Sequence, residues 1–267
     1  MHLAASIGLL QSKLGDDSPL ITHPDEASTT FSTTAQAFLG SVFVGFDALS
    51  SALFWDDKEQ CNHAAILHRW QASDTSFFGC KNWVVVTISQ TNQLRRWKAL
   101  MIEQESLSNA LLVSRASQLQ RYIATQLLEH GTDLQNCDEV EVDIATYISA
   151  QAAMIYLHVL MSGPHPDVPE IRYSVENCLP QIEKAVQLGT LPWLAWSTCI
   201  IGCMAAKDLR NVYEMSLERM DKLYGVTSGY ARALATMREC WRLRDADACP
   251  AHWASAMQSL GITSLLI

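Results

Sequence analysis

This 267-residue sequence is poor in charged residues, which make up only 18% of it, against about 25% in an average soluble protein. Hydrophobic residues make up 49% of the chain. This share excludes an intrinsically disordered chain, because such chains have too little apolar surface to bury. The length is sufficient for a full hydrophobic core. We therefore expect a largely buried body of packed helices.

Basic residues are scarce. The chain has 19 Lys and Arg residues against 28 Asp and Glu residues, a net charge of −9, and no run of five basic residues. Proteins that bind nucleic acid contact phosphates with clustered Lys and Arg side chains. The sequence therefore predicts that this chain makes no direct contact with nucleic acid.

The short motifs of nucleotide-binding and hydrolytic enzymes are also missing. The chain contains neither GxGxxG nor GxxxxGK[ST], the glycine-rich loops that hold phosphates. The segment GVTSG at 225–229 has the wrong spacing for the GxSxG turn of serine hydrolases. It reads better as a loop ending in Ser228 as a helix cap. We therefore predict no catalytic and no cofactor-binding residues, and an enzyme is the less favoured class.

The eight cysteines have no close-spaced framework, and the nearest pair is Cys199 and Cys203. His63 and His68 would lie about 140° apart on a helix, a poor arrangement for one metal ion. The pattern favours buried free thiols in a reducing compartment. We expect no metal site and no bound zinc in this chain.

The sequence shows little sign of a targeting or membrane segment. The first residues, MHLAASIGLL, lack the basic start of a signal peptide, and no convincing cleavage site follows. No uninterrupted apolar run approaches the roughly 18 residues of a membrane span. We therefore expect a soluble, intracellular protein without a membrane segment.

Apolar residues recur every three or four positions from Ala35 onward, which predicts helices. The segment 143–161 is apolar on nearly all sides, as is typical of a central helix. After Pro169 the apolar positions step by 4, 3, 4 and 3 residues, although Pro180 should kink or divide that helix. The predicted apolar stripes are Leu112, Ala116, Leu119, Ile123 and Leu127, then Ile171, Val175, Cys178, Ile182 and Ala185.

The segment 191–206 is more apolar than a surface helix needs to be, so we expect the core to surround it. The next helix, with Asp208 as its N-cap and a charged outer face, should cover it over residues 208–223. Gly202 would let a neighbouring helix approach closely. The side chains expected to be buried are those of Ile155, Leu160, Trp193 and Trp196.

The segment NWVVVTIS at 82–89 has the β-branched residues of a strand but no partner strand in the sequence. We therefore predict a helix there and an all-α fold. It should form a single multi-helical domain of roughly eight to twelve helices over residues 36–267, after an irregular lead-in over residues 1–35.

Few polar residues stand out as candidates for a site. His158 lies in the most apolar helix, where a buried, hydrogen-bonded histidine is the usual interpretation, and with Gln151 and Tyr156 it is our candidate for a pocket. Trp193 and Trp196 are candidate interaction residues, although aromatic residues at helical spacing are usually core. The arginines between 210 and 244 alternate with glutamates, which indicates an ion-paired, solvated helix surface.

Several segments, taken in order, resemble one family. GFDALSSALF at 45–54 and GCKNWVVVTISQTNQLRRWK at 79–98 resemble the first blocks of the fungal-specific transcription factor domain. The segments at 148–175 and 191–210 resemble its central helix and its Pro-Trp…Gly-Cys-Met-Ala block. RECWRLRD at 238–245 and the tail at 252–267 resemble its end. The resemblance covers roughly residues 36–267.

The resemblance implies an all-helical regulatory domain of zinc-cluster transcription factors, located in the nucleus, or alternatively in the cytoplasm. It implies protein partners (co-regulators or a second copy) and a small-molecule effector. The six-cysteine zinc cluster of the family has no counterpart in residues 1–35, so zinc would belong to a separate upstream segment. A fragment and a free-standing protein both stay open, as do a helical enzyme or ligand-binding protein of secondary metabolism and a plain scaffold.

Overall fold

The fold is all-α. The structure, a computed structural model, describes residues 42–55, 79–130, 140–189, 192–225, 229–246 and 251–266. Over these residues it contains helices and no strand. The predicted lead-in over 1–35, His63, His68 and Ser228 lie outside the described residues. The elements are a helix at Val42–Phe54, then α4 (Asn82–Glu103), α5 (Asn109–His130), α6 (Val140–Ser162), α7 (Pro169–Leu188), the short 3-10 helix η1 (Pro192–Leu194), α8 (Ala195–Cys203), α9 (Arg210–Tyr224), α10 (Tyr230–Asp245) and α11 (Trp253–Leu260).

The strand-like segment is helical, as predicted, and lies near the start of α4. Val84 and Ile88 are buried in the core, and the Thr87 hydroxyl donates a hydrogen bond to the Trp83 carbonyl at 2.9 Å. Core packing thus outweighs the slight helix penalty of β-branched side chains. The local preference for strand is overridden because no second strand pairs with it in the described chain.

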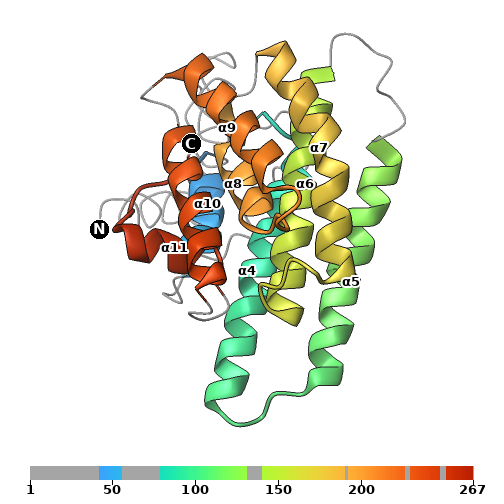
Figure 1. Ribbon diagram of the computed structural model, residues 1–267. Coiled ribbons are helices and arrows are strands. Elements are labelled where there is room, and N and C mark those ends of the chain that lie inside the picture. The colour runs from blue at the N-terminus through green and yellow to red at the C-terminus, as the bar shows by residue number, and fades with distance from the viewer. Residues whose placement is uncertain are drawn as a thin grey trace, which may run out of the picture.

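The central element is α6, as the sequence predicts. It contacts α4, α5, α7 and α8, and Figure 1 shows α5 and α7 running beside it. In the described part of the chain it is the one helix long and apolar enough to cross a membrane, a property that the sequence analysis did not find. However, 83% of that stretch is buried inside the fold. Its apolar character is therefore accounted for by its place in the core.

Helix α7 follows its predicted stripe throughout, since all five of its apolar positions are buried. It runs through Pro180 as one helix, so of the two expected effects of this proline, a kink or a division, the division does not occur. An interior proline costs about 3 kcal/mol. Burying several large apolar side chains, each worth about 1.5–3 kcal/mol, outweighs that cost.

Helix α8 is enclosed by the core, as predicted, and every one of its residues is buried. The helix that approaches it at Gly202 is α10, however, rather than α9. A Cβ atom at Gly202 would overlap the Met237 sulfur of α10 and would lie 3.7 Å from a ring carbon of Tyr213 in α9. The predicted Asp208 cap is also wrong: Leu209 precedes α9, and the Asp208 carboxylate instead pairs with Arg172 at 2.8 Å.

Candidate functional site

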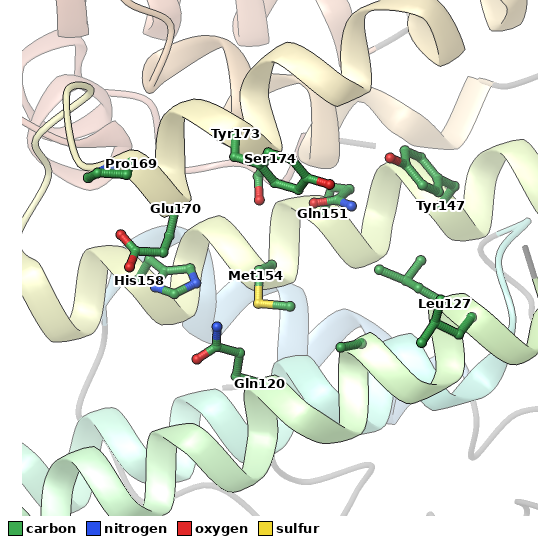
Figure 2. A pocket seen from close by; sticks show the side chains of 12 residues that line it. Gln120, Leu127, Tyr147, Gln151, Met154, His158, Pro169, Glu170, Tyr173 and Ser174 are labelled. Carbon is green, nitrogen blue, oxygen red and sulfur yellow. The ribbon is translucent and has the colours of Figure 1, made fainter.

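A cleft of about 670 Å³ lies between α5, α6 and α7 (Figure 2). This volume lies within the range of about 300–1,000 Å³ found for small-molecule sites. We call it the α5–α6–α7 cleft. Its lining residues are Gln120, Ala124, Leu127 and Leu128 of α5, Tyr147, Gln151, Met154 and His158 of α6, and Pro169, Glu170, Tyr173 and Ser174 of α7.

Each helix presents one stripe of side chains to this cleft. On α6 the lining positions are spaced by 4, 3 and 4 residues, which places them on one face. On α5 the spacing of 4, 3 and 1 has the same effect. Helix α7 forms the third wall of the cleft. The chain turns after α6 at Gly163, which has a positive φ of 83°, and α7 then begins with Pro169 in its first turn. The cleft is thus formed where α5 and α7 flank the same side of α6.

The polar groups of the cleft are uncharged except at one point. Burial lowers the pKa of His158 below its usual value, and the nearby Glu170 only partly opposes this shift. Burial also raises the pKa of Tyr147, while the Gln151 amide acts in the opposite direction. At neutral pH both rings are therefore neutral. No Lys or Arg is among the lining residues, and Glu170 supplies the one formal charge.

Two of the five candidate residues line the cleft. Gln151 and His158 are both buried side chains that face it, and Figure 2 shows them along the same helix. The sequence analysis missed Tyr147 and Met154, which share their stripe. α6 is apolar on nearly all sides, so polar–apolar contrast could not indicate which face would stay uncovered.

The structure does not bring Tyr156 into the cleft. It lies two residues before His158, about 200° away around the helix. Its hydroxyl donates a hydrogen bond to the Asn92 side-chain oxygen at 2.8 Å and accepts one from the Arg95 Nε at 3.2 Å. Tyr156 therefore belongs to a buried polar network between α6 and α4.

Trp193 and Trp196 lie away from the cleft and differ from each other. Trp196 is 2% exposed and belongs to the core, as do Ile155 and Leu160, whereas Trp193 is 39% exposed. The prediction that Trp193 is buried is therefore wrong. It is the middle residue of η1, two residues before α8 begins, and its ring is only partly covered. Both tryptophans line a cavity of only about 20 Å³, which is little more than the space of one water molecule.

A second cavity, of about 420 Å³, is lined by Arg95 and Lys98 of α4 and by His252. The Lys98 Nζ donates a hydrogen bond to the Leu160 carbonyl at 2.6 Å, near the end of α6. The His252 ring stacks on Trp55 with a centroid distance of 4.2 Å. Burial lowers the pKa of His252 to about 4. The sequence analysis did not predict this cavity, because the residues that line it come from segments far apart in the chain.

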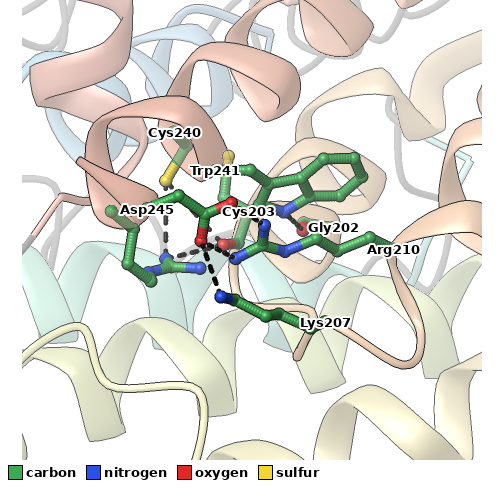
Figure 3. Close-up of polar contacts among 8 residues, drawn as sticks. Gly202, Cys203, Lys207, Arg210, Cys240, Trp241 and Asp245 are labelled. Carbon is green, nitrogen blue, oxygen red and sulfur yellow. Dashed lines mark hydrogen bonds and ion pairs between the residues drawn. The ribbon is translucent and has the colours of Figure 1, made fainter.

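Part of the arginine-rich segment binds backbone carbonyls of neighbouring elements instead of facing solvent (Figure 3). Arg244 donates hydrogen bonds to the carbonyls of Cys203 at 2.8 Å and Ala251 at 3.2 Å. The Trp241 indole donates to the Gly202 carbonyl at 2.9 Å. The Gly202 and Cys203 carbonyls lie in the last turn of α8, where a helix leaves carbonyls without intrahelical partners. The Gly202 carbonyl also accepts the Ala205 backbone N–H at 3.1 Å. By contrast, Arg238 pairs with Glu214 and Glu218, each at 2.6 Å, in the predicted exposed manner.

The five cysteines in the described residues are buried and free, as predicted. The Cys199 and Cys203 sulfurs lie 4.0 Å apart on one face of α8, and burial is the main reason that the pKa of the Cys203 thiol is well raised. A protonated thiol is a poor metal ligand. Over the described ranges no group of three or more His, Cys, Asp or Glu residues is placed to hold a metal ion.

We predict that the purified chain carries well below one zinc ion per molecule. The physical reason is that its described thiols are buried and that burial raises the pKa of the Cys178 and Cys203 thiols, which keeps them protonated. Elemental analysis after dialysis without chelator measures the ratio. One tightly held equivalent would show that donors outside the described residues form a zinc site.

Comparisons with known proteins identify the family. A model of the fungal specific transcription factor domain matches residues 1–267. The trichothecene biosynthesis transcription regulator TRI10 of Fusarium sporotrichioides is 28% identical over 70% of this chain and 44% of its own length. The ustiloxin B cluster transcription factor ustR of Aspergillus flavus is 24% identical over the whole chain and 51% of its own length.

A third relative, the transcription factor dibT of Pestalotiopsis microspora, is 27% identical over 98% of this chain and 46% of its own length. The chain thus spans about half the length of these curated relatives. No solved structure matches it significantly. Because the family model matches from the first residue to the last, the chain belongs to the fungal-specific transcription factor domain family.

Proposed function

We propose that this chain is the regulatory domain of a transcription factor that controls a secondary-metabolite gene cluster, and that it acts through protein partners in the nucleus. The observation that carries the proposal is the family match over the whole chain. The relatives named for trichothecene biosynthesis and for the ustiloxin B cluster support the choice of gene cluster. Co-regulators or a second copy of the chain are the proposed partners.

The charge distribution supports a domain that leaves DNA contact to another segment. The net charge is −9, and several arginines on the described helices form ion pairs with carboxylates. Arg172 pairs with Glu176 and Asp208, each at 2.8 Å, and Arg210 pairs with Asp245 at 2.6 Å. Arginines held in this way are poorly placed to neutralise phosphates.

A helical enzyme or ligand-binding protein is the alternative. The α5–α6–α7 cleft favours ligand binding over catalysis. An activated nucleophile needs an adjacent base that is itself oriented by a third group. The histidine of the cleft, His158, has no hydrogen-bond partner among the described residues to orient it.

The test joins residues 1–267 to a heterologous DNA-binding domain and measures a reporter gene in a fungal host. We expect transcription to change by several-fold relative to the DNA-binding domain alone. In parallel, fluorescence anisotropy of labelled DNA measures the purified chain. Weak binding at low salt that disappears at moderate salt is expected. Nanomolar, sequence-selective DNA binding at physiological salt, or an unchanged reporter, would contradict the proposal.

A further inference from the structure

We propose that the α5–α6–α7 cleft is the binding site for an elongated, uncharged small molecule with a hydrogen-bonding oxygen near each end and an apolar middle. Binding itself concerns the isolated domain. Any effect of the ligand on transcription rests on the function proposed above. The proposal follows from the order of side chains along the cleft, its charge, and one buried polar group.

The buried polar group is His158. Its side chain is 9% exposed, and the described residues place no hydrogen-bond partner on its ring. Leaving a buried polar group without a partner costs free energy, so such groups are normally satisfied by protein, water or ligand. The His158 ring lines the cleft (Figure 2). The ring nitrogens are not among the fully buried polar atoms that lack a partner, so water in the open cleft reaches them. A ligand oxygen in the cleft would replace that water as the hydrogen-bond partner of the ring.

A second polar position lies further along the same helix. Gln151 is also buried and lines the cleft. Seven residues separate it from His158, which corresponds to about 10 Å along a helix axis. Between them α6 lines the cleft with Met154, while Gln120 lies across from it on the α5 wall and Leu127 lies further along, near Tyr147 (Figure 2). Along α6 this order fits a molecule with two oxygen functions about 10 Å apart and an apolar segment that contacts Met154.

The charge of the cleft selects against anions. Its lining residues include no Lys or Arg, and Glu170 lies at the His158 end (Figure 2). Burial keeps His158 neutral at pH 7, because its pKa is lowered. A carboxylate or sulfonate in the cleft would lose its hydration, face Glu170, and gain no countercharge. An uncharged ligand avoids these costs.

The first experiment titrates the purified chain with Nile red, an uncharged dye with a flat apolar ring system and a carbonyl oxygen. Ala124 lines the cleft from an exposed position on α5, so Ala124→Trp fills the cleft without overpacking the core. Ala110→Trp is the matched control, since Ala110 is exposed on the same helix outside the lining residues. Circular dichroism checks that each variant is folded.

We expect saturable binding of about one dye per chain. Affinity should fall at least about tenfold in Ala124→Trp and stay unchanged in Ala110→Trp. His158→Phe should weaken binding by about twofold to tenfold, the effect of one lost hydrogen bond. The anionic dye 1-anilinonaphthalene-8-sulfonate should not bind in the cleft, so any binding of this dye should be equal in the unmodified chain and in Ala124→Trp. Dye binding that is equal in all variants would overturn the proposal.

A competition experiment on the unmodified chain avoids any dependence on variant folding. 1,10-Decanediol, which has two hydroxyls on an apolar chain, should displace Nile red, and decanedioic acid at pH 7 should not. Equal displacement by the diacid, or none by the diol, would contradict the proposal. The reporter fusion distinguishes this proposal from the proposed function. If the fusion changes transcription but the isolated domain binds none of these probes, the proposed function stands and the ligand-site proposal is wrong.

Discussion

Replacing Trp196 by alanine is expected to lower the free energy of unfolding by about 3–5 kcal/mol. Trp196 is 2% exposed and lies in α8, a helix whose residues are all buried. Its indole nitrogen is buried and makes no hydrogen bond in the described part of the chain. The loss is therefore that of apolar burial and of the cavity left behind. Chemical denaturation followed by circular dichroism measures it.

Trp193→Ala is the matched control, because Trp193 stands three residues earlier and is 39% exposed. Its truncation opens a cavity to solvent, so we expect a cost well below that of Trp196→Ala. Trp196→Phe should recover most of the stability, since it keeps an aromatic ring in the core and removes the unpartnered N–H group. Equal costs at Trp193 and Trp196 would show that this part of the core is packed differently.

Replacing Gly202 by leucine is expected to cost about 1–3 kcal/mol by overpacking. A Cβ atom at this position would overlap the Met237 sulfur and lie 3.2 Å from the Met237 Cγ. Met237 is itself fully buried, so its side chain has little room to move aside. Gly202 also accepts the Trp241 hydrogen bond through its carbonyl. A shift of the helices would stretch that bond. The same unfolding experiment measures the cost.

A double-mutant cycle tests whether Met237 is the cause. Met237→Ala alone should destabilise through a cavity of its own. Combined with Gly202→Leu, the new side chain can occupy part of the vacated space. The double variant should therefore be more stable than the sum of the two single effects implies. Strictly additive costs, or a neutral Gly202→Leu, would mean that α8 and α10 are not in close contact there.

The sequence by itself determined the helices and their buried stripes. In α7 every predicted apolar position, from Ile171 to Ala185, is buried. In α5, Leu112, Ala116 and Ile123 of the predicted stripe are buried, whereas Leu119 and Leu127 are only partly buried. Helical periodicity is a local property of the chain, and burial of one stripe is its direct consequence. The absence of a second strand in the sequence likewise decided that residues 82–89 form a helix.

Only the tertiary structure decided which partner each face meets. The pattern that predicted Trp196 in the core applied equally to Trp193, yet the neighbouring elements cover one ring and leave the other 39% exposed. Tyr156 and His158 lie in the same apolar helix, but one meets Asn92 and Arg95 and the other lines a cleft. Arg244 meets the end of α8, 41 residues away in sequence. Contacts of this kind depend on how helices distant in the chain pack against one another. A cleft formed by three helices is a property of their packing, and no single segment encodes it.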